Sequence, residues 1–224
     1  MNKRASIPAP GAQSLTDLAY AQVEELIVTL KLSPGRVVSE AELSELTGIG
    51  RTPIREALQR LAREKLVSIL PRRGIVVTDI NVGSQLRLLE VRRELERLIA
   101  RLAARRATGE ERRRFRELAR DFEKSARAND DTNFMRTDRE YNTLCSEASH
   151  NDFAAGAMTL MHSLSRRFWY IHYKQAADMP LTAKLHADIA RAIADADEER
   201  AGKASDRLLD EIEKFTRETV SGDV

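Results

Sequence analysis

Apolar residues recur every three or four positions along most of the chain, which is the spacing of amphipathic helices. Near the N-terminus this spacing predicts a helix over 15–32, with Thr16 as its cap and Ser33-Pro34-Gly35 ending it. Residues 1–14 precede the pattern and are predicted to form a flexible arm.

Two shorter helices are predicted next. Ser39 and Glu42 form an S-x-x-E capping box at the start of one helix, and Gly48 ends it. Thr52 is predicted to cap the other, with Pro53 in the first turn, where a missing N–H costs nothing. Four apolar residues are predicted to form the buried side of this helix: Ile54, Ala57, Leu58 and Leu61.

Alternation typical of strands follows over 66–70 and 74–78, on either side of Pro71-Arg72-Arg73. This predicts a two-stranded hairpin with a basic tip. Three helices followed by such a hairpin form a winged helix-turn-helix, here over 15–78, whose third helix enters the major groove of DNA.

The rest of the chain shows helical spacing alone. After a predicted linker over 79–83, six helices are predicted, at 84–107, 110–128, 132–149, 152–176, 182–195 and 198–220. The predicted fold is therefore mainly α, with a winged helix-turn-helix followed by an all-α six-helix bundle over 84–224. A bundle of this size can hold a ligand cavity and a dimerisation surface.

Composition excludes several classes of protein. The single cysteine, Cys145, rules out an internal disulfide and is expected to be a small buried hydrophobe. No apolar run reaches the roughly 18 residues that a membrane span needs, and the opening residues lack the apolar region of a signal peptide. We expect a cytoplasmic protein with no membrane partner.

Charge is unevenly distributed although the net charge is only +2. Lys and Arg exceed Asp and Glu by five over 49–78 and by six over 81–128, whereas the acids exceed the bases by six over 129–224. A local basic surface is typical of a polyanion partner.

Cations gather on the predicted third helix. Arg51, Arg55 and Gln59 are spaced by four residues opposite the buried side. Such a face is often merely solvated. Together with Thr52 and the basic tip Arg72-Arg73, however, it matches contacts to base edges and phosphates. This favours double-stranded DNA as a partner.

These residues resemble a known family. R-T-P-I-R-E-A-L-x-R-L at 51–61 and the strand residues at 66–77 are similar to the winged helix of GntR-type bacterial transcription regulators. LLEVRRELERLIARLAA at 88–104 resembles the start of the all-helical effector domain (FCD domain) of the FadR subfamily. Six predicted helices instead of seven resemble its shorter, vanillate-regulator-like branch.

The resemblance implies roles for individual residues. Arg51 and Arg55 would reach bases and phosphates, Thr52 the DNA backbone, and Arg73-Gly74 the minor groove. Some relatives have arginine in the second helix where this chain has Ala41, within Glu-Ala-Glu-Leu, so one contact is absent and the operator sequence stays open.

For the bundle, the resemblance implies an effector site. Arg92 stands where relatives have an arginine that binds a ligand carboxylate, for which the forked guanidinium is well suited. The alternative is an ion pair with Glu96, one helical turn later. We expect a small carboxylate metabolite as effector.

The metal site of the subfamily is incomplete in this chain. Asp138 and His186 match two of its ligands, but Asn142 and Leu208 occupy positions where histidines are expected. We therefore expect no metal cofactor and assign these four residues, with Arg92, to the effector. His162 and His172 are the remaining histidines that could complete a metal site.

Two other functions compete with this interpretation. A metal-dependent helical enzyme is disfavoured because the sequence has no H-E-x-x-H, G-x-S-x-G or phosphate-loop motif, so we expect no catalytic residues. An architectural DNA-binding protein without an effector stays open. We expect a homodimeric repressor that leaves an inverted-repeat operator when a carboxylate binds.

Overall fold

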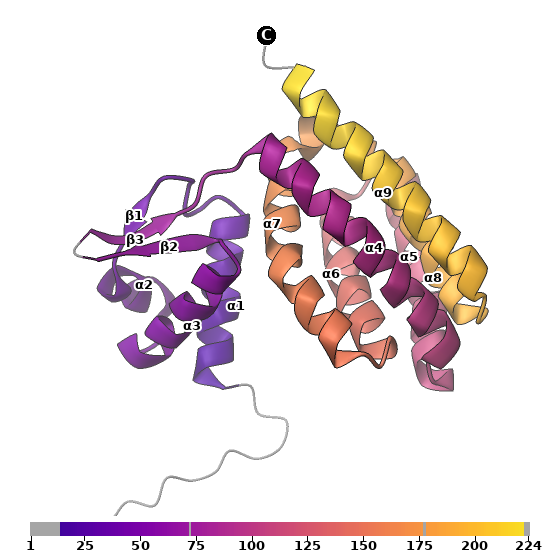
Figure 1. The fold of residues 1–224 in the computed structure, drawn as a ribbon, viewed down its shortest axis with the longest axis horizontal. Coiled ribbons are helices and arrows are strands. Elements are labelled where there is room, and N and C mark those ends of the chain that lie inside the picture. The colour runs from indigo at the N-terminus through magenta and orange to yellow at the C-terminus, as the bar shows by residue number, and fades with distance from the viewer. Residues whose placement is uncertain (1–13, 72, 177, 222–224) are drawn as a thin grey trace, which may run out of the picture. The chain divides into compact units, whose positions relative to one another are not determined.

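The computed structural model describes residues 14–71, 73–176 and 178–221. The predicted arm lies outside the described residues except for Ser14. The chain forms two compact units that divide between Asp79 and Ile80, and each is described by itself (Figure 1).

The N-terminal unit contains three helices and a small antiparallel sheet (Figure 1). Its elements are α1 (Leu15–Val28), β1 (Val37–Val38), α2 (Glu40–Thr47), α3 (Arg51–Arg63), β2 (Val67–Leu70) and β3 (Gly74–Val77). The sheet order is β1-β3-β2, with Val38 opposite Ile75 and Ile69 opposite the same residue on the other side. The helices and the sheet enclose a small core that includes Val23, Ile27, Leu43, Leu58 and Leu61. The predicted winged helix-turn-helix is confirmed.

The sheet has one strand more than the sequence predicted. We expected a two-stranded hairpin, but Val37 and Val38 pair with β3 as a third strand. A strand of two residues is too short to show alternation, and the only signal is the pair of β-branched valines.

Two predicted helix caps are wrong. Ser14, in place of Thr16, caps α1 by accepting a hydrogen bond from the Asp17 amide, and α1 ends at Val28, four residues early. Gly50 precedes α3 without a side-chain cap, so Thr52 lies in the first turn instead of capping it. α1 begins at Leu15, within the predicted range, and its cap lies two residues before Thr16. α3 begins at Arg51, one residue before the predicted cap, because a polar first residue carries no apolar spacing.

The second helix follows its prediction more closely. Ser39 caps α2 by accepting from the Glu42 amide, and Gly48 ends it in the left-handed conformation at φ 68°. The Glu42 carboxylate accepts a hydrogen bond from Arg36, so the observed cap is the Ser39 half of the predicted box.

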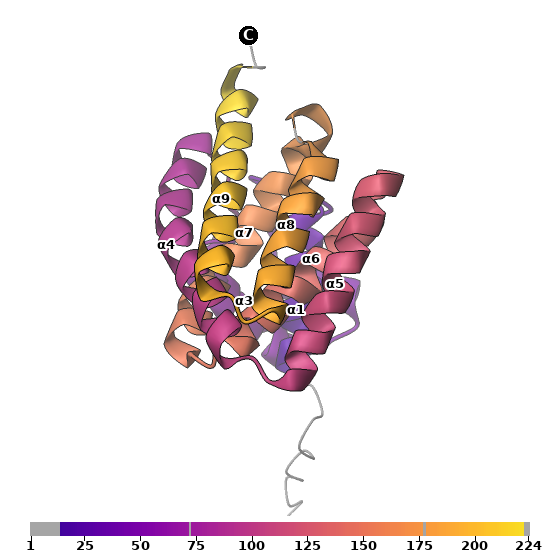
Figure 2. The same ribbon diagram turned by 90° about the vertical axis from the view of Figure 1, so that its right-hand side faces the viewer.

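The C-terminal unit is a helical bundle, as predicted. Its helices are α4 (Val82–Arg106), α5 (Gly109–Ala128), α6 (Asp131–Ala148), α7 (Asp152–Ala176), α8 (Met179–Ala194) and α9 (Glu198–Ser221). In Figure 2, α4, α9, α8 and α5 lie side by side, with α6 and α7 behind them. Helix α8 is buried on nearly all sides because alanines, among them Ala183, Ala187 and Ala190, let its neighbours approach closely.

Two bundle boundaries differ from the predictions. Asn81 caps α4, which starts at Val82, so part of the predicted linker 79–83 is helical. Asp178 caps α8, and Met179-Pro180, expected between helices, forms its first turn. Proline is favoured there because no intrahelical N–H bond is lost.

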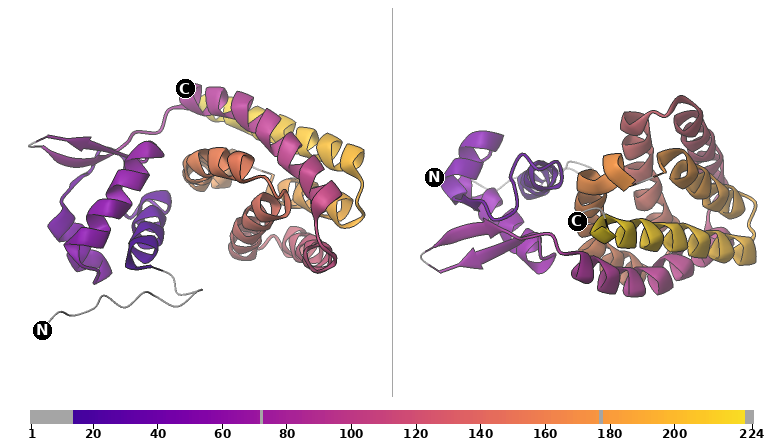
Figure 3. Two further views of the ribbon diagram at one scale, coloured as in Figure 1. Left: turned by 60° about the horizontal axis from the view of Figure 1, so that its bottom comes forward. Right: turned by 90° about the horizontal axis from the view of Figure 1, so that it is seen from above.

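Several arginines of the basic stretch 81–128 are paired within the bundle. Helices α4 and α9 run side by side (Figure 3). Arg93 and Arg97 on α4 form ion pairs with acidic residues of α9, including Asp206 at 2.7 Å from Arg97. Arg106 and Arg112 donate to carbonyl oxygens at the ends of helices, groups that lack an intrahelical partner. The basic excess over 81–128 therefore has a structural use. No helix in the described ranges is long and apolar enough to cross a membrane.

Candidate nucleic-acid interface and bundle cavity

Helix α3 has the two faces that its sequence predicted. Ile54, Ala57, Leu58 and Leu61 are buried in the N-terminal unit. On the opposite side, the four predicted DNA contacts of this helix are exposed: Arg51, Thr52, Arg55 and Gln59. The polar face is therefore accessible to a partner of this unit.

Arg55 is held by a carboxylate of the preceding helix. Its Nε and Nη2 donate to the two oxygens of Glu40 on α2, both at 2.7 Å. The hydrogen bonds that Arg55 donates keep the pKa of the Glu40 carboxyl below its usual value, and the same bonds raise the pKa of Arg55. A bidentate pair fixes the plane of the guanidinium, so Arg55 is oriented before any DNA is bound.

Arg60 has a different environment although it lies on the same helix. Its guanidinium stacks over the Tyr20 ring, 3.7 Å from the centroid, and donates to Glu64. Burial raises the pKa of the Glu64 carboxyl above its usual value, against the lowering effects of Tyr20 and Arg60. We therefore assign Arg60 to the packing of α1 on α3.

The wing depends on a glycine. Gly74 adopts φ +96°, and a Cβ there would lie 3.2 Å from both Val37 Cγ1 and the Val38 carbonyl oxygen. Gly74 thus lets β3 approach β1. Arg73 is exposed beside it, and Arg72, the other predicted wing contact, lies outside the described residues.

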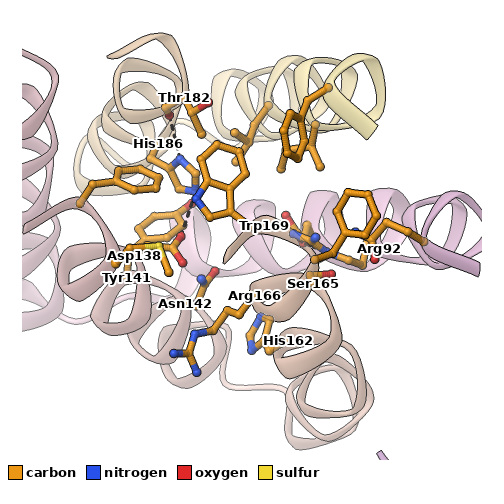
Figure 4. Close-up of a pocket in the computed structure, with 18 residues that line it drawn as sticks. Arg92, Asp138, Tyr141, Asn142, His162, Ser165, Arg166, Trp169, Thr182 and His186 are labelled. Atoms are coloured by element: carbon orange, nitrogen blue, oxygen red, sulfur yellow. Dashed lines mark hydrogen bonds and ion pairs between the residues drawn. The ribbon is translucent and has the colours of Figure 1, made fainter. Parts of the chain in front are cut away.

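A cavity of about 70 Å³ lies inside the bundle (Figure 4). Helices α4, α6, α7, α8 and α9 all contribute to its wall. All five residues predicted for the effector line it: Arg92, Asp138, Asn142, His186 and Leu208. Aromatic side chains, including Phe134, Phe168 and Trp169, form much of the remainder. The structure thus brings the five predicted residues, which come from four of these helices, together at one place.

Both a cavity and the Glu96 carboxylate lie beside Arg92. Arg92 lines the cavity, and it also pairs with Glu96, whose Oε1 accepts from Nε at 2.6 Å and lies 2.5 Å from Nη2. The two side chains are only 10% and 17% exposed. A ligand carboxylate at Arg92 would therefore meet a carboxylate already in place.

Asp138 and His186 form a second polar pair. His186 Nδ1 lies 2.8 Å from the Thr182 carbonyl oxygen, which can only accept, so Nδ1 carries a proton. Nε2 lies 3.1 Å from Asp138 Oδ1. Burial raises the pKa of the Asp138 carboxyl, but the hydrogen bond and charge of His186 outweigh burial and hold that pKa below its usual value. An ionised Asp138 carboxylate therefore lies beside the His186 ring, with Nε2 directed at Oδ1.

Three further polar groups of the wall come from α6 and α7: Asn142, His162 and Ser165. Asn142 and His162 are near each other in Figure 4. Burial lowers the pKa of His162 to about 4, so its imidazole is neutral at physiological pH. The Ser165 hydroxyl is buried and has no hydrogen-bond partner. An amide, a neutral imidazole and a hydroxyl can all bind an uncharged or anionic ligand group.

The donor set does not fit a transition metal. Asp138 and His186 face each other, Asn142 offers a weak amide oxygen, and Leu208 offers no donor. Within the described part of the chain, no three His, Cys, Asp or Glu side chains cluster as metal ligands would. His172 instead packs on Phe168, with ring centroids 4.6 Å apart. Cys145 is buried, and burial raises the pKa of its thiol.

Sequence reasoning missed several groups in the wall. Gln85 and Thr182 are buried polar residues that line the cavity, and Met135 and Trp169 add flexible and aromatic surface. Thr182 precedes His186 by one turn of the helix predicted over 182–195, which was a usable signal. Gln85 carried no signal, because a single glutamine on an amphipathic helix is usually solvated.

Comparison with known proteins identifies both units. Residues 15–77 match the model for bacterial regulatory proteins of the gntR family, and residues 87–211 match the FCD domain. An uncharacterized HTH-type transcriptional regulator of Streptomyces ambofaciens is 40% identical over 62 residues, and the match covers 28% of this chain and 26% of that protein. The HTH-type transcriptional repressor RspR of Escherichia coli is 23% identical over 92% of this chain and 90% of its own.

A solved structure shows the same fold over nearly the whole length. Escherichia coli McbR/YncC superposes with a TM-score of 0.79 at 18% identity, covering 93% of this chain and all of that one. The FCD match alone spans more than half of the chain, and the boundary between the two units lies between it and the gntR match. The chain therefore belongs to the GntR family of bacterial transcription regulators, with a winged helix-turn-helix DNA-binding unit followed by an FCD domain.

Proposed function

We propose that this regulator is a repressor, that it binds an inverted-repeat operator as a two-fold dimer, and that a small carboxylate metabolite in the bundle cavity releases it. The observation that carries the proposal is the cavity itself, in which Arg92 lies among aromatic side chains and hydrogen-bonding groups. Such a mixture of apolar wall and few polar groups is typical of small-molecule sites.

The DNA-binding part of the proposal rests on α3 and the wing. Arg51 and Thr52 are exposed in the first turn of α3, where helix-turn-helix proteins contact bases and phosphates. Arg55 is oriented by Glu40 for a bidentate contact, of the kind that recognises guanine. One such unit covers one half-site, so an inverted repeat needs two copies of the chain.

A carboxylate fits the cavity because an arginine fork lies in its wall. Arg92 uses Nε and Nη2 for Glu96, and its Nη1 donors are the ones a ligand would engage. The aromatic rings would pack on the hydrocarbon part of the ligand, with Leu208 adding apolar surface. We infer an acid with a short hydrocarbon or aromatic body.

Thermal unfolding with a series of acids tests the effector. The panel is acetate through octanoate with benzoate, and an acid that binds only the folded protein raises the melting temperature. Trp169 is the single tryptophan and lines the cavity, so its fluorescence reports binding at this place. If every acid, and the matching alcohols and amines, leaves both signals unchanged, the effector-independent architectural function replaces the proposal.

Operator release needs a second measurement. Operator fragments selected from random DNA are titrated with the protein in fluorescence anisotropy at fixed salt, with and without the acid. We expect the acid to lower operator affinity, because a ligand can shift only an equilibrium between states that it binds differently. Higher operator affinity with the acid would make the protein a corepressed or activating regulator.

We also propose that effector binding in this chain needs no metal ion. In the resembled subfamily a metal takes part in the site, but here Asp138 is paired with His186 and Leu208 supplies no ligand. The pair leaves both side chains satisfied without an ion. Acid binding measured by Trp169 fluorescence should therefore be unchanged by prior dialysis against a chelator.

A further inference from the structure

A buried hydroxyl group in the cavity wall lacks a hydrogen-bond partner among the described residues. Ser165 Oγ on α7 is enclosed by protein, and no donor or acceptor of the described chain bonds to it. Ser165 also lines the cavity. A buried polar group without a partner costs free energy, because it has lost its hydrogen bonds to water and gained none in exchange. Such a group in a cavity wall points to a partner that enters the cavity.

His162 precedes Ser165 by about one helical turn and lines the same cavity. Side chains three positions apart on a helix lie next to each other. Burial lowers the pKa of His162 to about 4, so its ring is neutral at physiological pH and offers one N–H donor and one acceptor nitrogen. The Ser165 hydroxyl also donates and accepts. Each of the two side chains can therefore donate to, or accept from, the same ligand group.

The charges in the wall favour an uncharged group at this place. Glu96 and Asp138 also line the cavity, and a second ligand carboxylate would meet both of them. Arg166 lines it as well, but its charge already acts on Asp138. An ammonium group would enter a place where burial keeps His162 itself from holding a proton. A hydroxyl group carries no charge, and it can donate to one partner while it accepts from the other.

We propose that Ser165 and His162 form a hydroxyl subsite, and that the effector is an acid that carries a hydroxyl group in addition to its carboxylate. The inference rests on the proposed function, because it takes the carboxylate at Arg92 as given and specifies the rest of the ligand. The ligand hydroxyl supplies Ser165 with the hydrogen bond that the described chain does not provide. A site that hydrogen-bonds a ligand hydroxyl discriminates strongly against the analogue that lacks it, because groups of the site are then left unpaired.

Isothermal titration calorimetry of the full chain with matched acids tests this specificity. The probes are 2-, 3- and 4-hydroxybutyrate and the three hydroxybenzoates. Each is compared with the unsubstituted acid and with the analogue that has a methyl group in place of the hydroxyl, because the two groups are similar in size. We expect at least one position at which the hydroxy acid binds about tenfold more tightly than the methyl analogue, the value of one to two net hydrogen bonds.

Ser165→Ala removes the hydroxyl group with the smallest change of shape. It should lower the tenfold preference to about twofold, and it should leave the affinity for the unsubstituted acid within about twofold of wild type, because only the hydroxy acid bonds to Ser165. Ser163→Ala is the matched control. Ser163 is a buried serine of the same helix outside the cavity wall, so this variant should keep the full preference.

Two variants of His162 test the other half of the subsite. His162→Leu removes both hydrogen-bonding atoms and should reduce the preference for the hydroxy acid. His162→Gln keeps a donor and an acceptor and should restore part of that preference, which a purely structural role of the ring would not explain. Circular dichroism establishes that each variant is folded.

The outcomes separate the subsite from the proposed function. If hydroxy acids and methyl analogues bind alike at every position, or if Ser165→Ala keeps the full preference, water alone satisfies Ser165, and the subsite is overturned while acid binding stands. If no acid of the panel binds, hydroxylated or plain, the proposed effector function fails and the subsite fails with it.

Discussion

Replacing Glu96 with glutamine should strengthen effector binding while it weakens the fold. Glu96 is the carboxylate that already occupies Arg92, at 2.6 Å from Nε. A ligand carboxylate on the other edge of the guanidinium would lie on the order of 5 Å from Glu96. At an effective dielectric constant of about 20, two like charges at that distance repel by roughly 3 kcal/mol.

The substitution removes this repulsion at a cost to stability. If about half of the repulsion is recovered, the acid found by thermal unfolding should bind Glu96→Gln about tenfold more tightly. Arg92 exchanges a charged acceptor for a neutral one, so the free energy of unfolding should fall by about 1 kcal/mol. In a chain of this length that lowers the melting temperature by about 2–4 °C.

Trp169 fluorescence titration and thermal unfolding measure the two effects on the same samples. Arg92→Ala is the companion variant and should lose about 10- to 150-fold in affinity for the acid, the value of a hydrogen bond to a charged group. Arg92→Lys separates charge from the fork and should recover only part of this loss. If Glu96→Gln binds the acid less tightly than wild type, Glu96 contacts the ligand directly and the assignment of Arg92 as the carboxylate clamp is wrong.

Three further predictions concern DNA binding, metal content and the pH dependence of stability. Arg51→Ala and Arg55→Ala should each lower operator affinity about 5- to 150-fold, whereas Arg72→Ala should weaken binding to all DNA sequences alike. If anisotropy gives wild-type operator affinity for Arg51→Ala and Arg55→Ala, the assignment of α3 to DNA contact is refuted. Protein purified without a His-tag or chelator should contain no stoichiometric zinc or nickel by elemental analysis, and metal that is lost in His186→Ala would contradict the proposed metal independence. Because burial lowers the pKa of His162 from 6.5 to about 4, the unfolded chain binds the extra proton, so the free energy of unfolding should fall by up to about 3 kcal/mol from pH 7 to pH 4; in His162→Asn this fall should shrink.

The sequence predicted the elements that have strong periodicity. The buried side of α3, the wing and all six bundle helices follow from apolar spacing, and the end of α2 follows from Gly48. It failed where local chemistry is ambiguous. Ser14 and Thr16 are both acceptable caps for α1, and Gly50 and Thr52 are both acceptable caps for α3. Which of the two is used depends on tertiary packing that no local pattern contains.

The cavity could be predicted only in part for a related reason. Position along α4 and α6 identified Arg92, Asp138 and Asn142 through resemblance, but no spacing rule shows that Gln85 of α4 and Thr182 of α8 meet them. Contacts between helices depend on crossing geometry. The competing ion pair of Arg92 with Glu96 was visible in the sequence, and the structure shows that it and cavity lining are compatible.

The size of the cavity bears on how an effector could act. An apolar cavity of about 150 Å³ binds benzene, and the cavity here measures about 70 Å³. An aromatic or branched acid can therefore enter only if the walls of the cavity move apart. These walls include α4 and α7. Both helices also carry exposed apolar side chains, among them Leu98 on α4 and Phe153 on α7. Because packed interiors shift between discrete arrangements and do not deform continuously, we expect the expansion to change how two copies meet, and with it the distance between their α3 helices.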